Sequence, residues 1–125
     1  MPIAYRYDDT ANRLVTRCEG AVTYQEVVEH FRQLGRDRRI KPHCDVVLDL
    51  SFQARLATAE QLDQIAEIIA DMIEITPLGR CAVVAPEDVV YGLGRMFQGF
   101  TWPLFTGIKV FRSNTEALAW LDTDT

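Results

Sequence analysis

The sequence has little of several residue types on which metal sites and disulfide-rich scaffolds depend. Only two histidines, His30 and His43, are present, and the three cysteines include no Cys-x-x-Cys pair. An odd set of this kind argues against a disulfide framework and a zinc knuckle, so we expect reduced structural thiols. No stretch approaches the roughly 20 apolar residues that span a bilayer, and the amino end does not resemble a signal peptide. These absences predict a cytoplasmic protein without membrane insertion.

Basic residues are also scarce. The formal net charge is -5, and residues 45–79 carry seven acids against Arg55 alone. The one basic cluster, residues 36–41, is interrupted by Asp37. Nucleic acid is therefore not expected as a partner, because neutralising its phosphates requires a basic face. The length of 125 residues matches one domain, residues 1–125, with a single core.

Five short apolar stretches have the length and composition of strands. The first two are separated by residues 8–12, which are rich in turn formers and predict a hairpin. The third is a continuous run of β-branched and aliphatic residues, typical of a strand at the centre of a sheet, and residues 52–57 should be the loop that follows it. The predicted strands are residues 3–7, 14–18, 46–48, 80–85 and 108–112.

Helices are predicted between and after these strands. Each of three helix starts has a Ser or Thr followed three residues later by Glu or Gln, the capping-box pattern in which the two side chains satisfy unpaired backbone amides. The first helix should end near Gly35, the second before Pro77, and a third should run from Pro86 to about Gln98. The three capping pairs are Thr23 with Glu26, Thr58 with Gln61 and Ser113 with Glu116.

Helices of this length between strands require crossover connections, which favour parallel pairing, whereas the first hairpin adds an antiparallel edge. We therefore predict an α/β fold with a mixed, mostly parallel sheet of about five strands, covered by helices, in the order β-β-α-β-α-β-α-β-α.

The chain resembles the STAS superfamily in this order of elements, in the strand motif Asp45-Val-Val-Leu-Asp-Leu-Ser51 and in the ending Val110-Phe-Arg-Ser-Asn-Thr-Glu-Ala-Leu-Ala-Trp-Leu121. More narrowly, it is similar to the bacterial SpoIIAA-like branch, which is related to anti-sigma-factor antagonists and to CRAL-TRIO lipid-binding domains. The resemblance covers nearly the whole chain. It implies a non-enzymatic regulatory module that acts through protein-protein interaction. The alternative that it implies is a carrier or sensor of an apolar or lipid-like small molecule.

The resemblance also implies phosphorylation of a Ser or Thr in the loop between the third strand and the second long helix. The loop here lacks the family's Asp-Ser-x-Gly pattern, and only Thr58 falls near the right place, with Ser51 as a second candidate. A phosphate on Thr58 would lie at a helix N-terminus, where free amides stabilise negative charge. The alternative is that Thr58 simply caps the helix.

Two further groups of residues are candidates for binding. Asp49 and Ser51 follow the central strand at its carboxyl end, where open α/β sheets place ligands, although Asp49 alternatively caps the next turn. Gly92 and Gly94 suggest close approach, a break or movement in the third helix, and large apolar residues follow them. This apolar segment should form a homodimer interface, an apolar ligand site or the edge of the core. Its candidate residues are Met96, Phe97, Phe100, Trp102 and Phe105.

No combination of residues predicts catalysis. His43 and Cys44 are adjacent, but neighbouring strand residues point to opposite faces, and a third group is missing. We therefore predict no enzyme activity, no catalytic residue, no metal site and no cofactor. His30, beside Phe31, is expected at the surface of the first helix.

Overall fold

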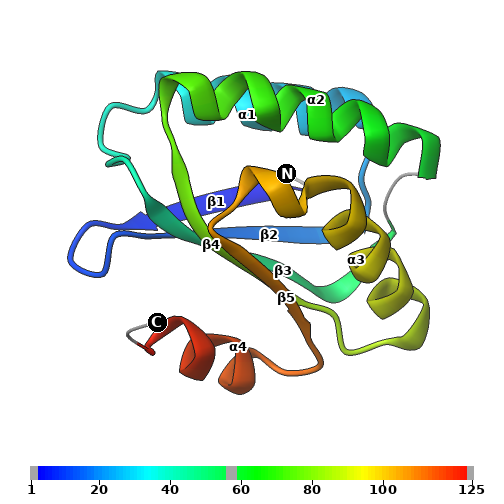
Figure 1. The fold of residues 1–125 in the computed structure, drawn as a ribbon. Helices are drawn as coiled ribbons and strands as arrows, with labels where there is room; N and C mark the ends of the chain where they lie inside the picture. The colour runs from blue at the N-terminus through cyan, green and yellow to red at the C-terminus, as the bar shows by residue number, and fades with distance from the viewer. Residues whose placement is uncertain (1–2, 56–58, 124–125) are drawn as a thin grey trace.

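The computed structural model of the chain describes residues 3–55 and 59–123 (Figure 1). The described residues form a single sheet and four α-helices, with one short 3-10 helix after α3. None of these helices has the length and apolar character required to cross a membrane. The elements in chain order are β1 (Ile3–Asp8), β2 (Arg13–Ala21), α1 (Tyr24–Arg36), β3 (Cys44–Arg55), α2 (Ala59–Ile75), β4 (Leu78–Val84), α3 (Asp88–Thr101), η1 (Trp102–Leu104), β5 (Gly107–Phe111) and α4 (Asn114–Leu121).

The sheet is mixed, and its strands lie in the order β1-β2-β3-β4-β5. β1 pairs with β2 in antiparallel register, whereas β2 with β3, β3 with β4 and β4 with β5 are parallel pairs. The predicted α/β class and mixed sheet are confirmed. β3 occupies the centre of the sheet, and its apolar residues are covered on both faces, as the sequence predicts for a central strand.

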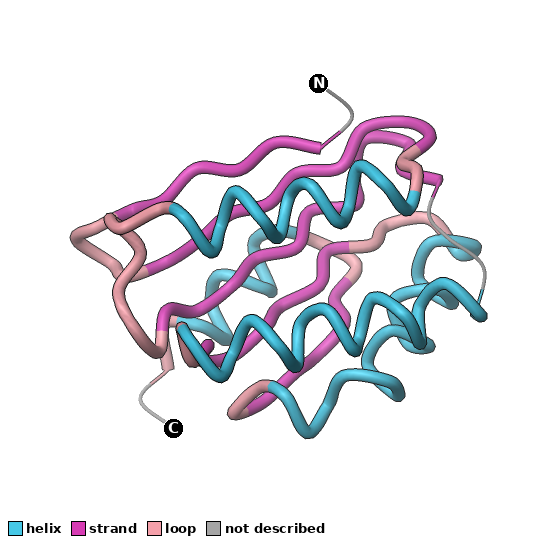
Figure 2. The backbone as a smooth tube through the Cα atoms, turned by 90° about the horizontal axis from the view of Figure 1, so that it is seen from above, coloured by secondary structure: helices cyan, strands magenta, loops and turns pink. Residues whose placement is uncertain are grey.

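Three helices cover one face of the sheet, and α4 alone covers the other (Figures 1 and 2). Each parallel strand is added beside the previous one, so the three crossovers through α1, α2 and α3 all progress in the same direction. Parallel crossovers are right-handed almost without exception, and successive crossovers of one hand and one direction stay on one face. The order of the strands therefore decides where the thick apolar layer forms.

The predicted caps are partly confirmed. At α1 the capping box is complete, because the Thr23 hydroxyl accepts from the amide of Glu26 at 3.1 Å and the Glu26 carboxylate accepts from the amide of Thr23 at 2.9 Å. At α4 only half of the box forms: Ser113 accepts from the amide of Glu116. Thr58, the third predicted cap, lies outside the described residues.

Residues 52–55 were predicted as a loop, and this prediction is wrong. β3 continues to Arg55 because β2 also continues, and Glu19 pairs with Phe52 after a shift in register. The shift is a bulge that places Phe52 on the same face as Arg17, whose guanidinium lies 3.8 Å from the centre of the Phe52 ring. A local sequence pattern does not show this pairing, since the partner strand is remote in the chain.

The third helix also runs beyond its predicted end near Gln98. The Gln98 side chain donates to the carbonyl of Ile108 in β5 at 3.0 Å, and the Thr101 hydroxyl donates to the carbonyl of Phe97 at 2.7 Å. The Gln98 bond holds the last turn of α3 against the sheet, and the Thr101 bond stabilises that turn from within the helix. The short helix η1, with Pro103, then redirects the chain toward β5.

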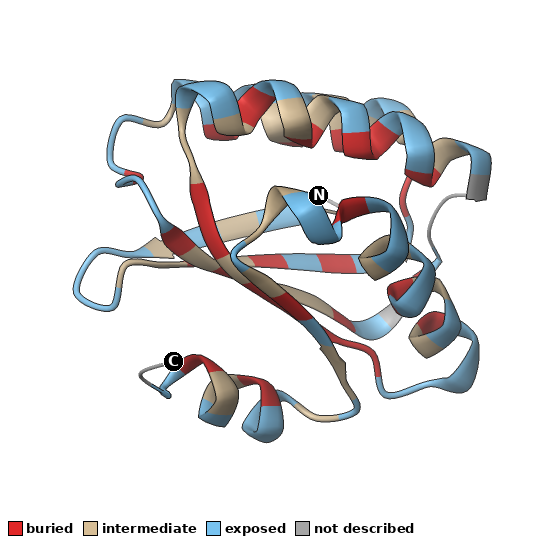
Figure 3. Ribbon diagram, viewed as in Figure 1, coloured by how far each residue is buried: buried red, intermediate tan, exposed pale blue. Residues whose placement is uncertain are grey.

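The core has two parts of unequal size (Figure 3). The larger lies between the sheet and α1, α2 and α3. The smaller lies under α4 and consists of Val47, Ala82, Val84, Ala117 and Leu121. Arg80 fastens α4 to this face, because its guanidinium donates to the carbonyls of Trp120 at 3.1 Å and Leu121 at 2.6 Å.

The two glycines that were singled out in α3 differ in their surroundings. A Cβ atom on Gly94 would lie 3.1 Å from a methyl group of Val110 and 3.3 Å from one of Val83, so this glycine lets α3 approach the sheet closely. A Cβ atom on Gly92 would have no neighbour within 4 Å. Gly92 therefore lowers helix stability without any gain in packing.

These surroundings predict opposite effects of alanine. Gly92→Ala should raise the free energy of unfolding by up to about 1 kcal/mol, because it restores helix propensity in open space. Gly94→Ala should lower it by about 1 kcal/mol, because overpacking two valines on rigid strands outweighs the same propensity gain. Urea denaturation of both variants measures the difference. Equal stabilisation by both would contradict the close approach at Gly94.

Candidate functional site

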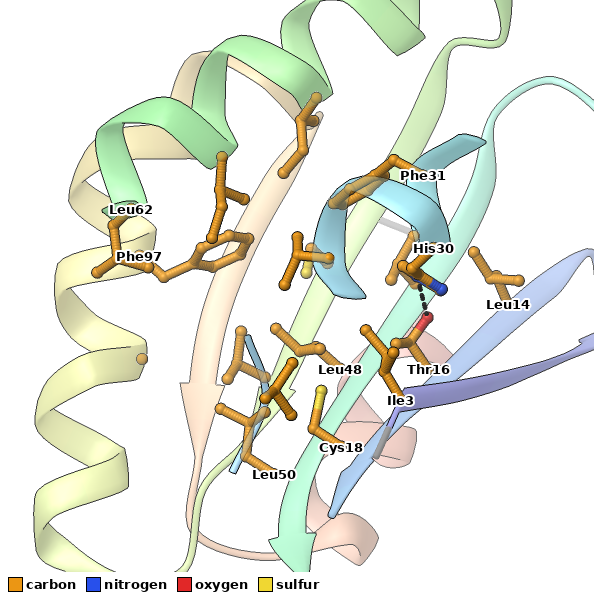
Figure 4. Close-up of a pocket in the computed structure, with 18 of the residues that line it drawn as sticks. Ile3, Leu14, Thr16, Cys18, His30, Phe31, Leu48, Leu50, Leu62 and Phe97 are labelled. Atoms are coloured by element: carbon orange, nitrogen blue, oxygen red, sulfur yellow. Dashed lines mark hydrogen bonds between the residues drawn. The ribbon is translucent and has the colours of Figure 1, made fainter. Parts of the chain in front are cut away.

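A cavity of about 90 Å³ lies within the larger core, between the sheet and helices α1, α2 and α3 (Figure 4). Four strands, the three helices and the segment after η1 contribute its walls. Nearly all of the lining is aliphatic or aromatic. Lining side chains include Ile3, Leu14, Thr16, Cys18, His30, Phe31, Leu48, Leu50, Leu62, Phe97 and Phe105.

The strand periodicity explains which residues reach the cavity. Side chains alternate between the two faces of a strand, so Leu14, Thr16 and Cys18 of β2 all point to the helical side. On β3 the alternate residues Val46, Leu48 and Leu50 do the same. An unfilled volume of this size in a protein core costs roughly 2 kcal/mol of stability. The fold tolerates this cost at the place where three helices meet a twisted sheet.

One polar pair interrupts the apolar wall. The Thr16 hydroxyl and Nε2 of His30 are 3.3 Å apart and form a hydrogen bond (Figure 4). His30 is only 5 % exposed, and its second ring nitrogen, Nδ1, is buried without a hydrogen-bond partner among the described residues. Burial lowers the pKa of His30 to about 4, so the imidazole is neutral near pH 7.

The expectation that His30 lies at the surface is wrong. His30 occupies the buried stripe of α1, three residues after Val27 and four before Leu34, which are both in the core. This spacing is present in the sequence and could have identified the residue as buried. The Tyr5 and Phe31 rings pack edge-on against the imidazole, with ring centres 5.6 and 5.2 Å away. The imidazole of His30 is therefore packed between two aromatic rings.

The cysteine thiols remain protonated. Burial, followed by the nearby charge of Asp49, raises the pKa of Cys18 to about 12, and burial also raises the pKa of Cys81. Both thiols line the cavity. Cys44 is buried as well, and burial raises its pKa to about 11. Because the thiolate is the reactive form, none of the three is activated as a nucleophile.

The structure separates the predicted apolar segment into two groups. Phe97 and Phe105 line the cavity and are half-buried. Met96, Phe100 and Trp102 face outward and are 40 %, 39 % and 65 % exposed. The sequence does not distinguish the two groups. Which residues of α3 and η1 face the sheet depends on where the rest of the chain places the sheet.

Asp49 and Ser51 do not belong to the cavity. They lie on the opposite face of β3 from Leu48 and Leu50, and Asp49 accepts hydrogen bonds from the amide of Ser51 at 2.9 Å and from its hydroxyl. This local bonding gives Oδ1 of Asp49 two donors. Thr58, the principal phosphorylation candidate, lies outside the described residues.

The adjacent residues His43 and Cys44 differ in their exposure to solvent. His43 is exposed and has a φ angle of 63°, whereas Cys44 is fully buried. Within residues 3–55 and 59–123, no three His, Cys, Asp or Glu side chains converge in a geometry that could hold a metal ion.

Comparison with known proteins gave no assignment. No protein-family model matches the chain, and no curated protein matches it in sequence. The cavity and its neighbouring surfaces are therefore the basis for inferring a function.

The burial of His30 predicts a pH dependence of stability. Its pKa of about 4 in the folded chain is below the ordinary histidine value of 6.5, so the unfolded chain binds the proton first and stability is lost as pH falls through this window. Between pH 7.5 and pH 5 the loss from this residue should be roughly 2 kcal/mol.

His30→Phe should abolish this part of the pH dependence, which urea unfolding at the two pH values measures. The difference between wild type and variant isolates the contribution of His30 from that of the other titrating groups. Parallel pH profiles for the two proteins would show that His30 is accessible to protons in the folded state.

Proposed function

We propose that the chain is a non-enzymatic binding domain that holds a small apolar molecule in the cavity between its sheet and helices α1 to α3. The observation that carries the proposal is the cavity of about 90 Å³ with an almost wholly apolar lining. Most protein interiors are packed without voids of this size, and pre-formed apolar cavities with few polar groups are the usual form of a small-molecule site.

The chemistry of the lining supports binding without reaction. The thiols of Cys18 and Cys81 are protonated, and the one imidazole is neutral and bonded to Thr16. No Asp, Glu, Lys or Arg side chain is among the lining residues that the structure describes. A nucleophile activated by a base, or a paired acid and base, is required for most hydrolytic chemistry. The site therefore suits a carrier or sensor.

The volume limits the ligand. A cavity of about 90 Å³ is smaller than the apolar cavity of about 150 Å³ that holds benzene, so a short chain of about five atoms fits and a whole phospholipid does not. This size fits the apolar-ligand alternative that the resemblance to STAS and CRAL-TRIO domains suggests, provided that the ligand is small or inserts only one end. We propose the SpoIIAA-like assignment on the resemblance alone, and a cytoplasmic location on the features of the sequence.

Filling the cavity should abolish binding. Xenon and n-pentane should bind the wild-type protein, as measured by chemical-shift changes of cavity-lining residues in NMR spectra. Cys18→Met, which adds atoms to a side chain in the wall, should remove this binding and raise the free energy of unfolding by about 1 kcal/mol.

The matched control is Cys18→Ala at the same position. It enlarges the cavity, so it should retain xenon binding while losing about 1 kcal/mol of stability. If the wild-type protein binds neither probe, or if Cys18→Met binds both as well as the wild type does, the cavity is not a ligand site.

A second proposed function rests on the outer face of α3 and η1. Met96, Phe100 and Trp102 are large apolar residues that remain exposed at one end of this segment. Exposed groups of this kind are typical of protein interfaces. We propose that a second copy of the chain covers them, since a twofold axis brings identical apolar patches together without requiring any complementary partner. Such a dimer would be a form of the protein-protein interaction that the family resemblance implies.

Sedimentation velocity tests this dimer. The wild-type protein should show concentration-dependent dimerisation, and the double variant Phe100→Ser with Trp102→Ser should remain monomeric. Ile75→Ser is the matched control, because Ile75 at the end of α2 is 80 % exposed but is not in the patch. A wild-type protein that remains monomeric at millimolar concentration contradicts the proposal.

A further inference from the structure

The sulfur-bearing side chains of the described residues differ widely in their access to solvent. Cys18, Cys44 and Cys81 are each at most 2 % exposed. Met72 of α2 belongs to the larger core and is 7 % exposed, whereas Met96 of α3 is 40 % exposed. Among the residues that the structure describes, Met96 therefore carries the sulfur that solvent reaches most easily.

The thiols are also chemically protected. Peroxides react with the thiolate form of cysteine, and burial is the main reason that the pKa of Cys18 is raised to about 12 and that of Cys44 to about 11. Burial likewise raises the pKa of Cys81. The thioether of methionine has no proton to lose, so exposure decides whether it is oxidised to the sulfoxide. Hydrogen peroxide should therefore oxidise Met96 before the other four.

Met96 lies in the exposed apolar patch that it forms with Phe100 and Trp102. Met96 and Phe100 are four residues apart in α3, so they are neighbours on one face of the helix. That face points away from the cavity, because Phe97 occupies the inner side. The patch that we propose as the dimer contact thus contains the most exposed sulfur of the described chain.

We infer that Met96 is an oxidation site through which a peroxide controls the proposed dimer. This inference rests on the second proposed function, since it names the regulation of the same patch. In the reaction the thioether sulfur attacks one oxygen of hydrogen peroxide. An S–O bond forms, the O–O bond breaks, and the leaving hydroxide takes up a proton and becomes water. Sulfur loses two electrons, and the peroxide gains them.

The sulfoxide changes the patch because it replaces an apolar thioether with a polar S–O group. In the monomer this oxygen is hydrated, whereas in the dimer it would lose water against side chains that are mainly hydrocarbon. A twofold axis places two such groups in each interface. Oxidation of Met96 should therefore raise the dissociation constant of the dimer at least about tenfold, the loss expected from one poorly paired polar group.

Peptide mass spectrometry tests the site of oxidation. In the folded wild-type protein, Met96 should be oxidised by hydrogen peroxide at least about fivefold faster than Met72, in line with their exposures, and the cysteines should stay unmodified. In urea both methionines are exposed and should react at similar rates, so Met72 is the internal control. Met1 lies outside the described residues and is followed in its own peptide. Equal rates for Met96 and Met72 in the folded protein would overturn the inference.

A second measurement links the site to the interface. If the dimer covers Met96, its oxidation rate at a fixed peroxide concentration should fall as the protein concentration, and with it the dimer fraction, rises. Exposure alone does not produce this dependence. The double variant Phe100→Ser with Trp102→Ser is the control, and its rate should not change with concentration. A wild-type rate that stays constant across the dimerisation range would place Met96 outside the interface and overturn the inference.

Sedimentation velocity then measures the effect on the dimer. Wild-type protein oxidised at Met96 should dimerise at least about tenfold more weakly, and reduction by methionine sulfoxide reductases should restore the dimer. Met96→Leu is the matched control, because leucine has a similar volume and cannot be oxidised, so this variant should dimerise equally well before and after peroxide. Met96→Gln introduces a polar group of similar length and should weaken the dimer without any oxidant.

The outcomes separate this inference from the dimer on which it rests. If the wild-type protein never dimerises, both are wrong. If it dimerises and the protein oxidised at Met96 sediments as before, the dimer stands and the control by oxidation is wrong. If peroxide weakens the dimer of Met96→Leu as much as that of the wild type, another oxidised group is responsible, which also overturns the inference.

Discussion

The apolar layer between the sheet and helices α1, α2 and α3 is the constraint on which the rest of the structure depends. Strands β2 to β5 are parallel and are added in chain order, so right-handed crossovers bring all three helices to one face. Burial of this layer provides the main driving force for folding. The side chains of the three helices and of the twisted sheet do not fill all the space between these layers, and the unfilled space is the cavity.

The opposite face of the sheet is stabilised differently. Its apolar cluster is small and lies under α4, so polar contacts contribute more to holding this element. Arg80 binds the carbonyl groups at the end of α4 and approaches Asp45 on β3 at 3.5 Å. The asymmetry explains why the candidate site is on the helical side. A thick layer can contain a void, whereas a single short helix packed directly on strands cannot.

Helix α3 connects the two proposed functions. Its inner side, with Leu93, Gly94 and Phe97, lines the cavity, and its outer side carries Met96 and Phe100. Gly94 draws this helix close to Val83 and Val110, so the inner side is tightly packed at that point. A ligand that presses on Phe97 acts on the same helix that presents the exposed patch. The proposed ligand and the proposed dimer contact would therefore lie on opposite sides of one helix.

The sequence by itself determined the α/β class, the central position of β3 and the capping box of α1, because periodicity, β-branched runs and caps are local signals. It could also have placed His30 in the buried stripe of α1. Only the tertiary structure decided the extension of β3 to Arg55, the separation of Phe97 from Phe100 and the cavity itself. Each of these features depends on distances between elements that are remote in the chain. The cavity in particular is the small difference between the space that the layers enclose and the volume of the side chains within it.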